Sequence, residues 1–149
     1  MCEGNGMRIY DSHVHLADVR FARSQREVLA RAGIVGVRAL LGVAAEARDW
    51  PRLLRLQQRY PQVGVALGLH PWFTHDPGAL LRLPLWLQRG HALAVGECGL
   101  DFGANRTARD TQEALLLPQL RLAREMNLPV ILHAHKSEDV LAMHLARMP

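Results

Sequence analysis

The histidine pair His13 and His15 is the clearest chemical feature of the sequence. If Ile9 to His15 is extended, successive side chains point to opposite sides, so both imidazoles face the same way. Imidazole is a common ligand of borderline divalent metal ions, and such a pair can bind one ion. A His-x-His pair has no unique meaning by itself, and the alternative is two surface histidines in a polar turn, with Asp11 as a helix cap.

Three more reactive side chains stand directly after other short apolar segments: His70, Glu97 and His133. Each has an ordinary explanation when taken alone: a loop residue before a proline, a solvated turn acid, and a core histidine with satisfied hydrogen bonds. The glycines near Glu97 allow close approach of the backbone, which favours a functional role for this carboxylate. The other histidines and the lysine are expected at the rim (His135, Lys136) or elsewhere on the surface (His75, His91, His144).

The elements that must position these side chains alternate along the chain. Short apolar segments predict strands over residues 7–10, 34–41, 63–67, 92–95 and 130–132. Helical periodicity predicts helices over residues 22–32, 51–60, 77–89, 107–126 and 137–147. The strand segments are apolar on both faces, which is typical of a sheet covered by helices on both sides. This alternation predicts an α/β fold with parallel strands joined by helical crossovers.

Three residues lead to specific predictions about the helices. An interior proline costs roughly 3 kcal/mol in a regular helix. We therefore expect either a short helix after Pro84 or two helical pieces, and a kink or a late start at Pro118. Ser137 is expected to be the N-cap of the last helix.

The carboxyl ends of parallel strands share one edge of the sheet, so the four strand ends should bring His, His, Glu and His to one place. A bridging carboxylate surrounded by imidazoles can hold one or two divalent ions. Such ions lower the pKa of bound water to about 7 and polarise a phosphoryl or carbonyl oxygen. The residues alone therefore predict metal-assisted hydrolysis.

Length and composition indicate the general class of protein. The 149 residues, 49% of them hydrophobic, suit a single globular domain with a real core. The formal charge of +4 and the predominance of arginine over lysine are compatible with an anionic substrate. Two cysteines make no disulfide framework, and neither a bilayer-length apolar segment nor a signal-peptide pattern occurs. We therefore expect a soluble cytoplasmic protein without a membrane partner.

Several motifs, taken in order, resemble the N-terminal part of the TatD-type metal-dependent hydrolases, also described as TatD-like deoxyribonucleases. The motifs are DSHVHL, GLHPWF, VGECGLDF, the segment QLRLAREMNLPVILH and the segment LAMHL. The resemblance covers nearly the whole chain. It implies a parallel (β/α) barrel of the TIM or amidohydrolase type with a one- or two-metal centre that hydrolyses phosphodiester bonds in DNA.

The resemblance also assigns roles to residues. His13 and His15 match the metal ligands of the first strand, and Glu97 matches the carboxylate that contacts both metals. His133 matches the metal-binding histidine of the fifth strand. His70 lies at the family's Gly-x-His-Pro position on the substrate side, and with Glu97 it is expected to be catalytic. No binding residue for an organic cofactor is implied.

The chain departs from the family pattern in two places and in length. His135 stands where the family usually has an arginine that could clamp a phosphate, and Ala17 stands where an acidic or amide residue is usual. A family member continues through three more strands, which supply another metal-binding histidine and an aspartate. Residues 1–149 are therefore expected to be the N-terminal part of one barrel domain, about five β/α units, with an incomplete set of ligands and weakened catalysis.

The leading hypothesis is thus a TatD-like deoxyribonuclease, truncated here and doubtful as an active enzyme alone. It would act on DNA with one or two Zn²⁺, Mn²⁺ or Mg²⁺ ions as cofactors. An amide, ester or phosphotriester hydrolase on the same barrel is the first alternative. The second is a non-catalytic remnant that associates with itself or with a complementing chain through open sheet edges.

Overall fold

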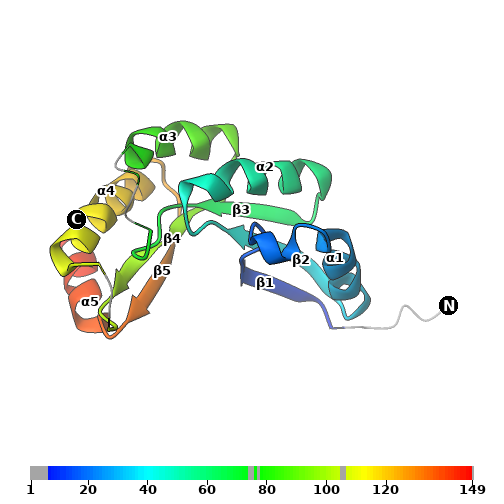
Figure 1. The fold of residues 1–149 in the computed structure, drawn as a ribbon, viewed down its shortest axis with the longest axis horizontal. Coiled ribbons are helices and arrows are strands. Elements are labelled where there is room, and N and C mark those ends of the chain that lie inside the picture. Colours follow the sequence, from blue (N-terminus) through cyan, green and yellow to red (C-terminus); the bar gives the residue numbers. More distant parts are fainter. Residues whose placement is uncertain (1–6, 74–75, 77, 105–106, 149) are drawn as a thin grey trace.

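Five strands alternate with five α-helices along the chain in a computed structural model that describes residues 7–73, 76, 78–104 and 107–148. The strands are β1 (Ile9–Val14), β2 (Val37–Val43), β3 (Val63–Leu67), β4 (Ala94–Asp101) and β5 (Val130–His135). The helices are α1 (Gln25–Ile34), α2 (Trp50–Arg59), α3 (Ala79–Arg89), α4 (Arg109–Glu125) and α5 (Glu138–Ala146). Two short 3-10 turns, η1 (Val19–Phe21) and η2 (Ala47–Asp49), precede α1 and α2 (Figure 1).

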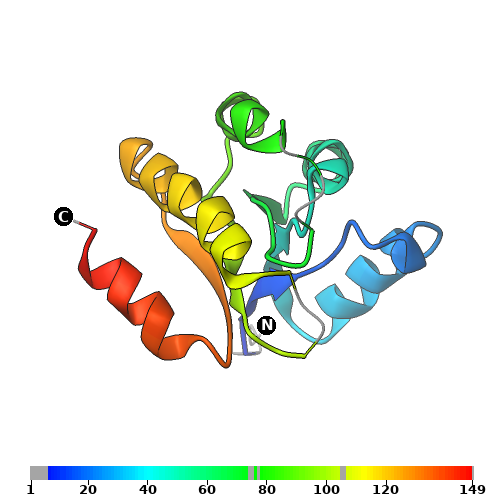
Figure 2. The ribbon, with the colours of Figure 1, turned by 60° about the vertical axis from the view of Figure 1, so that its left-hand side comes forward.

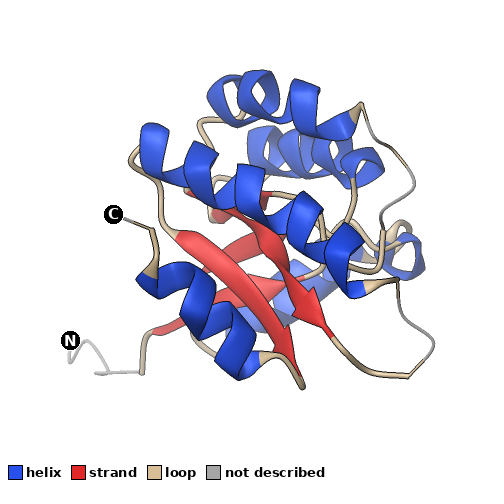
Figure 3. Cartoon of the chain, turned by 90° about the vertical axis from the view of Figure 1, so that its left-hand side faces the viewer, coloured by secondary structure: helices blue, strands red, loops and turns tan. Residues whose placement is uncertain are grey.

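The strands form one parallel sheet in the order β1-β2-β3-β4-β5, so each strand pairs with its neighbour in the sequence. The sheet is curled, and the helices follow one another in an arc along its convex side (Figure 2). This is an incomplete barrel, and the predicted α/β class is confirmed. The expectation of helices on both faces was wrong, because the described helices lie along the outer face of the curled sheet (Figure 2). Figure 3 shows the helices (blue) and the strands (red) from the side.

The main core lies between the helices and the outer face of the sheet. Helix α2 buries Trp50, Leu53 and Leu56, which recur every three residues, and leaves Arg55 and Arg59 exposed. The concave face has its own small apolar cluster, in which Val43, Ala66 and Ala94 pack against Leu41 and Ile131. The strands are apolar on both faces because a curled sheet packs its inner side chains against one another.

Three strands are longer than predicted, and the added residues include the polar ones. Strand β1 extends to Val14 and includes His13, β4 extends to Asp101 and includes Glu97, and β5 extends to His135 and includes His133. The polar motifs therefore lie partly within strands instead of in the loops after them. A strand holds a side chain more rigidly than a loop, so these positions suit a site that needs fixed geometry.

The prolines do not break the helices as predicted. Helix α3 runs without interruption through Pro84, and α4 begins at Arg109, well before Pro118. The expectation of a short or divided α3 was wrong, and so was that of a late start for α4, whereas a kink at Pro118 stays a prediction. In α3 the fully buried Leu83 and Leu87 anchor the helix on both sides of the proline, so burial of apolar area offsets the lost hydrogen bond.

Ser137 lies at the N-cap position of α5, but its hydroxyl does not cap the helix. It donates to the carbonyl of Leu100 (2.8 Å) and accepts from the backbone N–H of His135 (3.2 Å). The hydroxyl thus ties the end of β4 to the end of β5. None of the helices in the described ranges has the length and apolar character needed to cross a bilayer.

Candidate metal centre

Glu97 is the centre of the site. Its side chain is only 8% exposed, and both of its carboxylate oxygens face imidazoles. Oε2 lies 3.2 Å from His13 Nε2 and 3.4 Å from His15 Nε2, while Oε1 lies 3.1 Å from His133 Nδ1. Strands β1, β4 and β5, which are far apart in the sequence, therefore meet at one carboxylate.

His13 and His15 converge as their spacing predicts. Their Nε2 atoms are 3.4 Å apart, and both point at the same oxygen of Glu97. The other ring nitrogen of His15, Nδ1, lies 3.1 Å from the carbonyl of Val43 in β2. A carbonyl can only accept, so Nδ1 carries the proton and the lone pair of Nε2 is turned toward the centre. This is the orientation that a metal ligand needs.

His70 lies on the other side of Glu97, with its Nε2 3.9 Å from Oε1, and its ring packs against that of His133 at a centroid distance of 4.2 Å. The backbone N–H of Trp72 donates to His70 Nδ1 (3.2 Å). Nδ1 is therefore an acceptor, and in the neutral ring the proton is on Nε2. His70 thus offers a hydrogen-bond donor to the centre, which suits contact with a substrate oxygen better than ligation of an ion.

Asp101 belongs to the site, although the sequence reasoning did not include it. It is 1% exposed, and its Oδ2 lies 3.0 Å from His133 Nε2 and accepts a hydrogen bond from Trp72 Nε1 (2.7 Å). With Nε2 as donor to Asp101, His133 turns the lone pair of Nδ1 toward Glu97. A carboxylate behind a histidine is the usual way to fix the orientation of a metal ligand. Glu97 and Asp101 are four residues apart on one strand and share a face, and this spacing was the missed signal.

The charges at the centre are coupled. Burial raises the pKa of Glu97, but hydrogen bonds and charges from the surrounding imidazoles outweigh it and lower the pKa to about 2. The hydrogen bond to Glu97 is the main cause of the raised pKa of His15. Burial, and then the charge of His133, lower the pKa of His70 to about 4. At neutral pH the site therefore holds an ionised carboxylate beside a neutral, buried His70.

We expect the metal-free protein to lose stability as the pH falls from about 6.5 to about 4. His70 is buried and its folded-state pKa is depressed, so in this range the unfolded chain binds a proton that the folded protein does not. The loss should be at most about 3 kcal/mol. Urea unfolding in EDTA at several pH values measures it, and His70→Asn should flatten this dependence.

The raised pKa of His15 acts in the opposite sense. The stability that His15 contributes to the folded protein is fully present below the usual pKa of 6.5, and it is lost as the pH rises through the raised pKa of the folded state. Comparison of wild type with His70→Asn isolates the effect of His70, because His15 is common to both. An identical pH dependence in the two proteins would contradict the assignment.

Helix α4 fixes two strand ends through two buried glutamines that the sequence reasoning also missed. Gln119 accepts from the N–H of Leu69 (2.8 Å) and donates to its carbonyl (3.0 Å), next to His70. Gln112 makes the same pair of bonds with the backbone of Asp101, both at 2.7 Å. Each side-chain amide thus pairs with both the N–H and the carbonyl of one residue, as the backbone of a neighbouring strand does in a sheet. The two glutamines, at most 1% exposed, set the position of β3 relative to β4 where the site lies.

Gln119→Met should lower the free energy of unfolding by about 2–4 kcal/mol. Methionine keeps the length of the side chain but leaves the buried N–H and carbonyl of Leu69 unpaired, which costs about 1–3 kcal/mol for each group. Urea unfolding measures the change. Gln88→Met, at an exposed position of α3, is the matched control and should be nearly neutral. Equal stability of both variants would show that the Leu69 bonds contribute nothing.

The remaining histidines divide as follows. His135, Lys136 and His91 are exposed, as predicted, and His75 lies outside the described residues. His144 was expected at the surface, but its side chain is 11% exposed and its Nε2 lies 2.9 Å from Glu113 Oε2. This pair joins α5 to α4. It was missed because the apolar residues of α5 do not mark one clear buried face.

The donor set fits a divalent metal ion. His13, His15 and Glu97 form one group of potential ligand atoms within 4.8 Å of one another. Glu97 and His133 form a second together with His70, whose protonated Nε2 makes it a neighbour of the ion and not a ligand. Both groups combine imidazole nitrogen with carboxylate oxygen, and both contain Glu97. Nitrogen and oxygen donors of this kind suit borderline and hard divalent ions. The predicted site residues therefore lie together, and the sharing of Glu97 is the geometry expected for one or two ions.

Comparison with known protein families gives a match to the model described as "TatD related DNase" over residues 10–148. The "uncharacterized metal-dependent hydrolase YjjV" of Escherichia coli K12 is 39% identical over 144 residues, which are 94% of this chain and 56% of that protein. The "3′-5′ ssDNA/RNA exonuclease TatD" of Pantoea sp. At-9b is 35% identical over 140 residues, 90% of this chain and 53% of that protein.

A solved structure agrees with these matches. The crystal structure of YjjV, described as a TatD homolog from Escherichia coli K12, superposes with a TM-score of 0.89 at 38% identity. The match covers 94% of this chain and 56% of that one. The chain thus spans about half the length of the curated relatives that it matches.

Proposed function

Because the chain belongs to the TatD related DNase family, we propose that it carries the first part of a metal-dependent hydrolase that cleaves phosphodiester bonds in DNA. The observation that supports this most is the buried, ionised Glu97, which faces imidazoles from two other strands. The names of the relatives, a metal-dependent hydrolase and single-stranded DNA/RNA exonucleases, support both the reaction class and a nucleic-acid substrate. On this proposal, residues 1–149 correspond to the N-terminal part of one barrel domain.

We assign the metal ligands as His13, His15, Glu97 and His133. A bound ion would polarise a phosphoryl oxygen and lower the pKa of a water molecule. Zn²⁺ or Mn²⁺ suits the imidazole donors, while Mg²⁺ is common in phosphodiester chemistry. Asp101 holds His133 in its ligand orientation, and the carbonyl of Val43 does the same for His15. His70 donates a hydrogen bond from its Nε2–H to a phosphoryl oxygen of the substrate and keeps its proton.

The test is cleavage of a labelled single-stranded DNA by the chain with Mg²⁺, Mn²⁺ or Zn²⁺. We expect metal-dependent cleavage that Glu97→Ala abolishes and that Glu125→Ala, an exposed carboxylate on α4, leaves unchanged. Cleavage that does not distinguish Glu97→Ala from wild type would reject the proposed role. The substrate panel is completed by duplex DNA, RNA, an aryl ester and a phosphotriester. Faster turnover of the ester or the triester than of DNA would favour the alternative, an amide, ester or phosphotriester hydrolase.

We further propose that the chain pairs through its sheet edges with itself or with a complementing chain. Strands β1 and β5 are the two edges of the described sheet, and Tyr10 on β1 is 68% exposed. Unpaired edges with exposed apolar side chains favour strand pairing between chains. Light scattering after size exclusion tests this, and a monomer at all concentrations would contradict it.

We also place the protein in a reducing cytoplasm, since Cys98 is a buried free thiol.

A further inference from the structure

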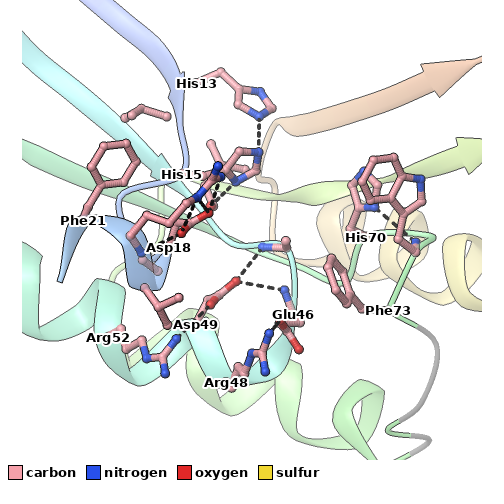
Figure 4. Close-up of a pocket in the computed structure, with 17 residues that line it drawn as sticks. His13, His15, Asp18, Phe21, Glu46, Arg48, Asp49, Arg52, His70 and Phe73 are labelled. Atoms are coloured by element: carbon pink, nitrogen blue, oxygen red, sulfur yellow. Dashed lines mark hydrogen bonds and ion pairs between the residues drawn. The ribbon is translucent and has the colours of Figure 1, made fainter.

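A pocket of about 550 Å³ adjoins the metal centre on the side of β1 and β2. His13, His15 and His70 form the wall next to the centre. The segment after β1, including η1, and the segment after β2, including η2, form the other walls (Figure 4). Small-molecule sites typically have about 300–1,000 Å³, so this pocket has the size of a ligand site.

Two arginines lie in the pocket across from His13 (Figure 4). Arg48 Nη2 pairs with Glu46 Oε1 at 2.5 Å, and Arg52 Nη1 lies 3.8 Å from Asp49 Oδ1. A guanidinium carries five N–H donors, so an ion pair through one nitrogen leaves others to bind a ligand. The second oxygen of Asp49 accepts from the backbone N–H groups of Ala45 and Glu46 (3.1 and 3.2 Å). Asp49 thus fixes the segment after β2 as well as facing Arg52.

The segment after β1 repeats this arrangement. Asp18 accepts from the backbone N–H of Arg20 (2.8 Å) and pairs with its guanidinium (2.7 Å). Arg20 also lines the pocket. The acidic residues of both segments therefore hold backbone and arginine side chains in place. Guanidinium groups bind phosphate through paired N–H donors, and they are the preferred side chains for that purpose.

Aromatic rings complete the walls. Phe21 follows Arg20 in η1, and Phe73 lies beside His70 with ring centroids 6.2 Å apart. Both are half-buried, so part of each ring remains accessible. Proteins that bind single-stranded nucleic acids combine basic side chains for the backbone with aromatic rings on which bases stack. This pocket holds both kinds of group beside the reactive centre.

We infer that this pocket binds a nucleotide of a single-stranded nucleic acid, its phosphate at Arg48 and Arg52 and its base against Phe21 and Phe73. The inference rests on the proposed function, because it places this nucleotide beside the phosphodiester that the centre would cleave. The pocket would then contribute affinity for the strand, while the metal centre acts on the neighbouring linkage. Arg48, whose side chain is 67% exposed, is available to a strand without rearrangement of the core.

The experiment measures binding of 3′-labelled thymidine pentanucleotide by fluorescence anisotropy in EDTA, so that no cleavage occurs. Arg48→Gln/Arg52→Gln should weaken binding at least tenfold, because hydrogen bonds to a charged phosphate are lost. The slope of log affinity against log salt should become shallower by about 0.7 for each lost phosphate contact. Arg121→Gln, which removes one exposed arginine from α4, should change neither quantity. Equal affinities for the double variant and this control would overturn the inference.

The base contact has its own test. Phe21→Leu/Phe73→Leu should weaken binding of the pentanucleotide about fivefold or more while leaving competition by inorganic tripolyphosphate unchanged. The assignment of the base to the two phenylalanines would be overturned if the variant lost both pentanucleotide binding and tripolyphosphate competition, or if it lost neither. Thermal melting of every variant shows whether it folds, and the arginine variants should melt at the same temperature as wild type. Binding is measured in EDTA and does not depend on a metal, so the two proposals can fail separately. If binding depends on the pocket residues but no metal supports cleavage, only the proposed function is refuted. If cleavage occurs but binding does not depend on the pocket residues, only the pocket inference is refuted.

Discussion

Glu97→Gln should remove divalent metal binding at both groups of ligands, with affinity lowered about 100-fold or more. Glutamine has nearly the same shape but no charge, and its amide nitrogen cannot replace a ligating oxygen. Loss of a residue that merely orients a ligand costs about 10–100-fold in affinity, so loss of a shared ligand should cost more. Calorimetric titration with Mn²⁺ or Zn²⁺ measures affinity and stoichiometry together.

Single-ligand variants make this result specific. His13→Asn should weaken only the group that contains His15, whereas His70→Asn should keep the stoichiometry of wild type, because His70 presents a donor proton to the centre. Glu27→Gln, on the exposed side of α1, controls for loss of charge. If Glu97→Gln bound metal like Glu27→Gln, Glu97 could not be the shared ligand.

Gly99→Ala should destabilise the protein by about 4 kcal/mol or more, or prevent folding. Gly99 has φ +153°, and a Cβ atom there would lie 1.9 Å from the backbone oxygen of His133. Gly99 pairs with His133 across β4 and β5, so any relief of the clash moves the strand that carries this metal ligand. Both the strained backbone and the forced movement of a strand belong to the most damaging effects of single substitutions. Urea unfolding and circular dichroism detect the loss.

Gly33→Ala is the matched control for the Gly99 substitution. A Cβ atom at Gly33 would meet no atom within 4 Å, and Gly33 lies in the last turn of α1. Alanine is favoured over glycine in a helix by up to about 1 kcal/mol, so this variant should be as stable as wild type or slightly more stable. Similar stabilities for the two alanine variants would mean that β5 can move away from β4 without cost.

The sequence predicted the convergence at the site because alternation along a strand is a strict local rule. His13 and His15 needed only an extended backbone to face one side, and the parallel order brought Glu97 and His133 to the same edge. Asp101 was missed because β4 was expected to end at residue 95. A strand continued to Asp101 places Glu97, Gly99 and Asp101 on one face, so an error in strand length concealed a site residue.

Tertiary packing decided the points at which sequence reasoning was wrong. The propensity of proline to break helices predicted a short helix after Pro84 or two pieces, yet buried Leu83 and Leu87 hold α3 together. Gln112 and Gln119 lie within the buried stripe of α4, an unusual place for polar side chains, but their partners are backbone groups that no periodicity identifies. Long-range hydrogen bonds of this kind, 50 residues apart for Gln119 and Leu69, become visible only in the folded chain.

The two glutamines of α4 also restrict how its length can change during evolution. A residue inserted or deleted in a helix rotates everything after it by about 100° and shifts it by about 1.5 Å. If such a change fell between Gln112 and Gln119, one side-chain amide could keep its hydrogen bonds to its strand end, but the other would be rotated away from its backbone partner. This stretch should therefore tolerate substitutions at its exposed positions while rejecting single-residue insertions and deletions. Length variation in natural or selected variants should be found outside this interval.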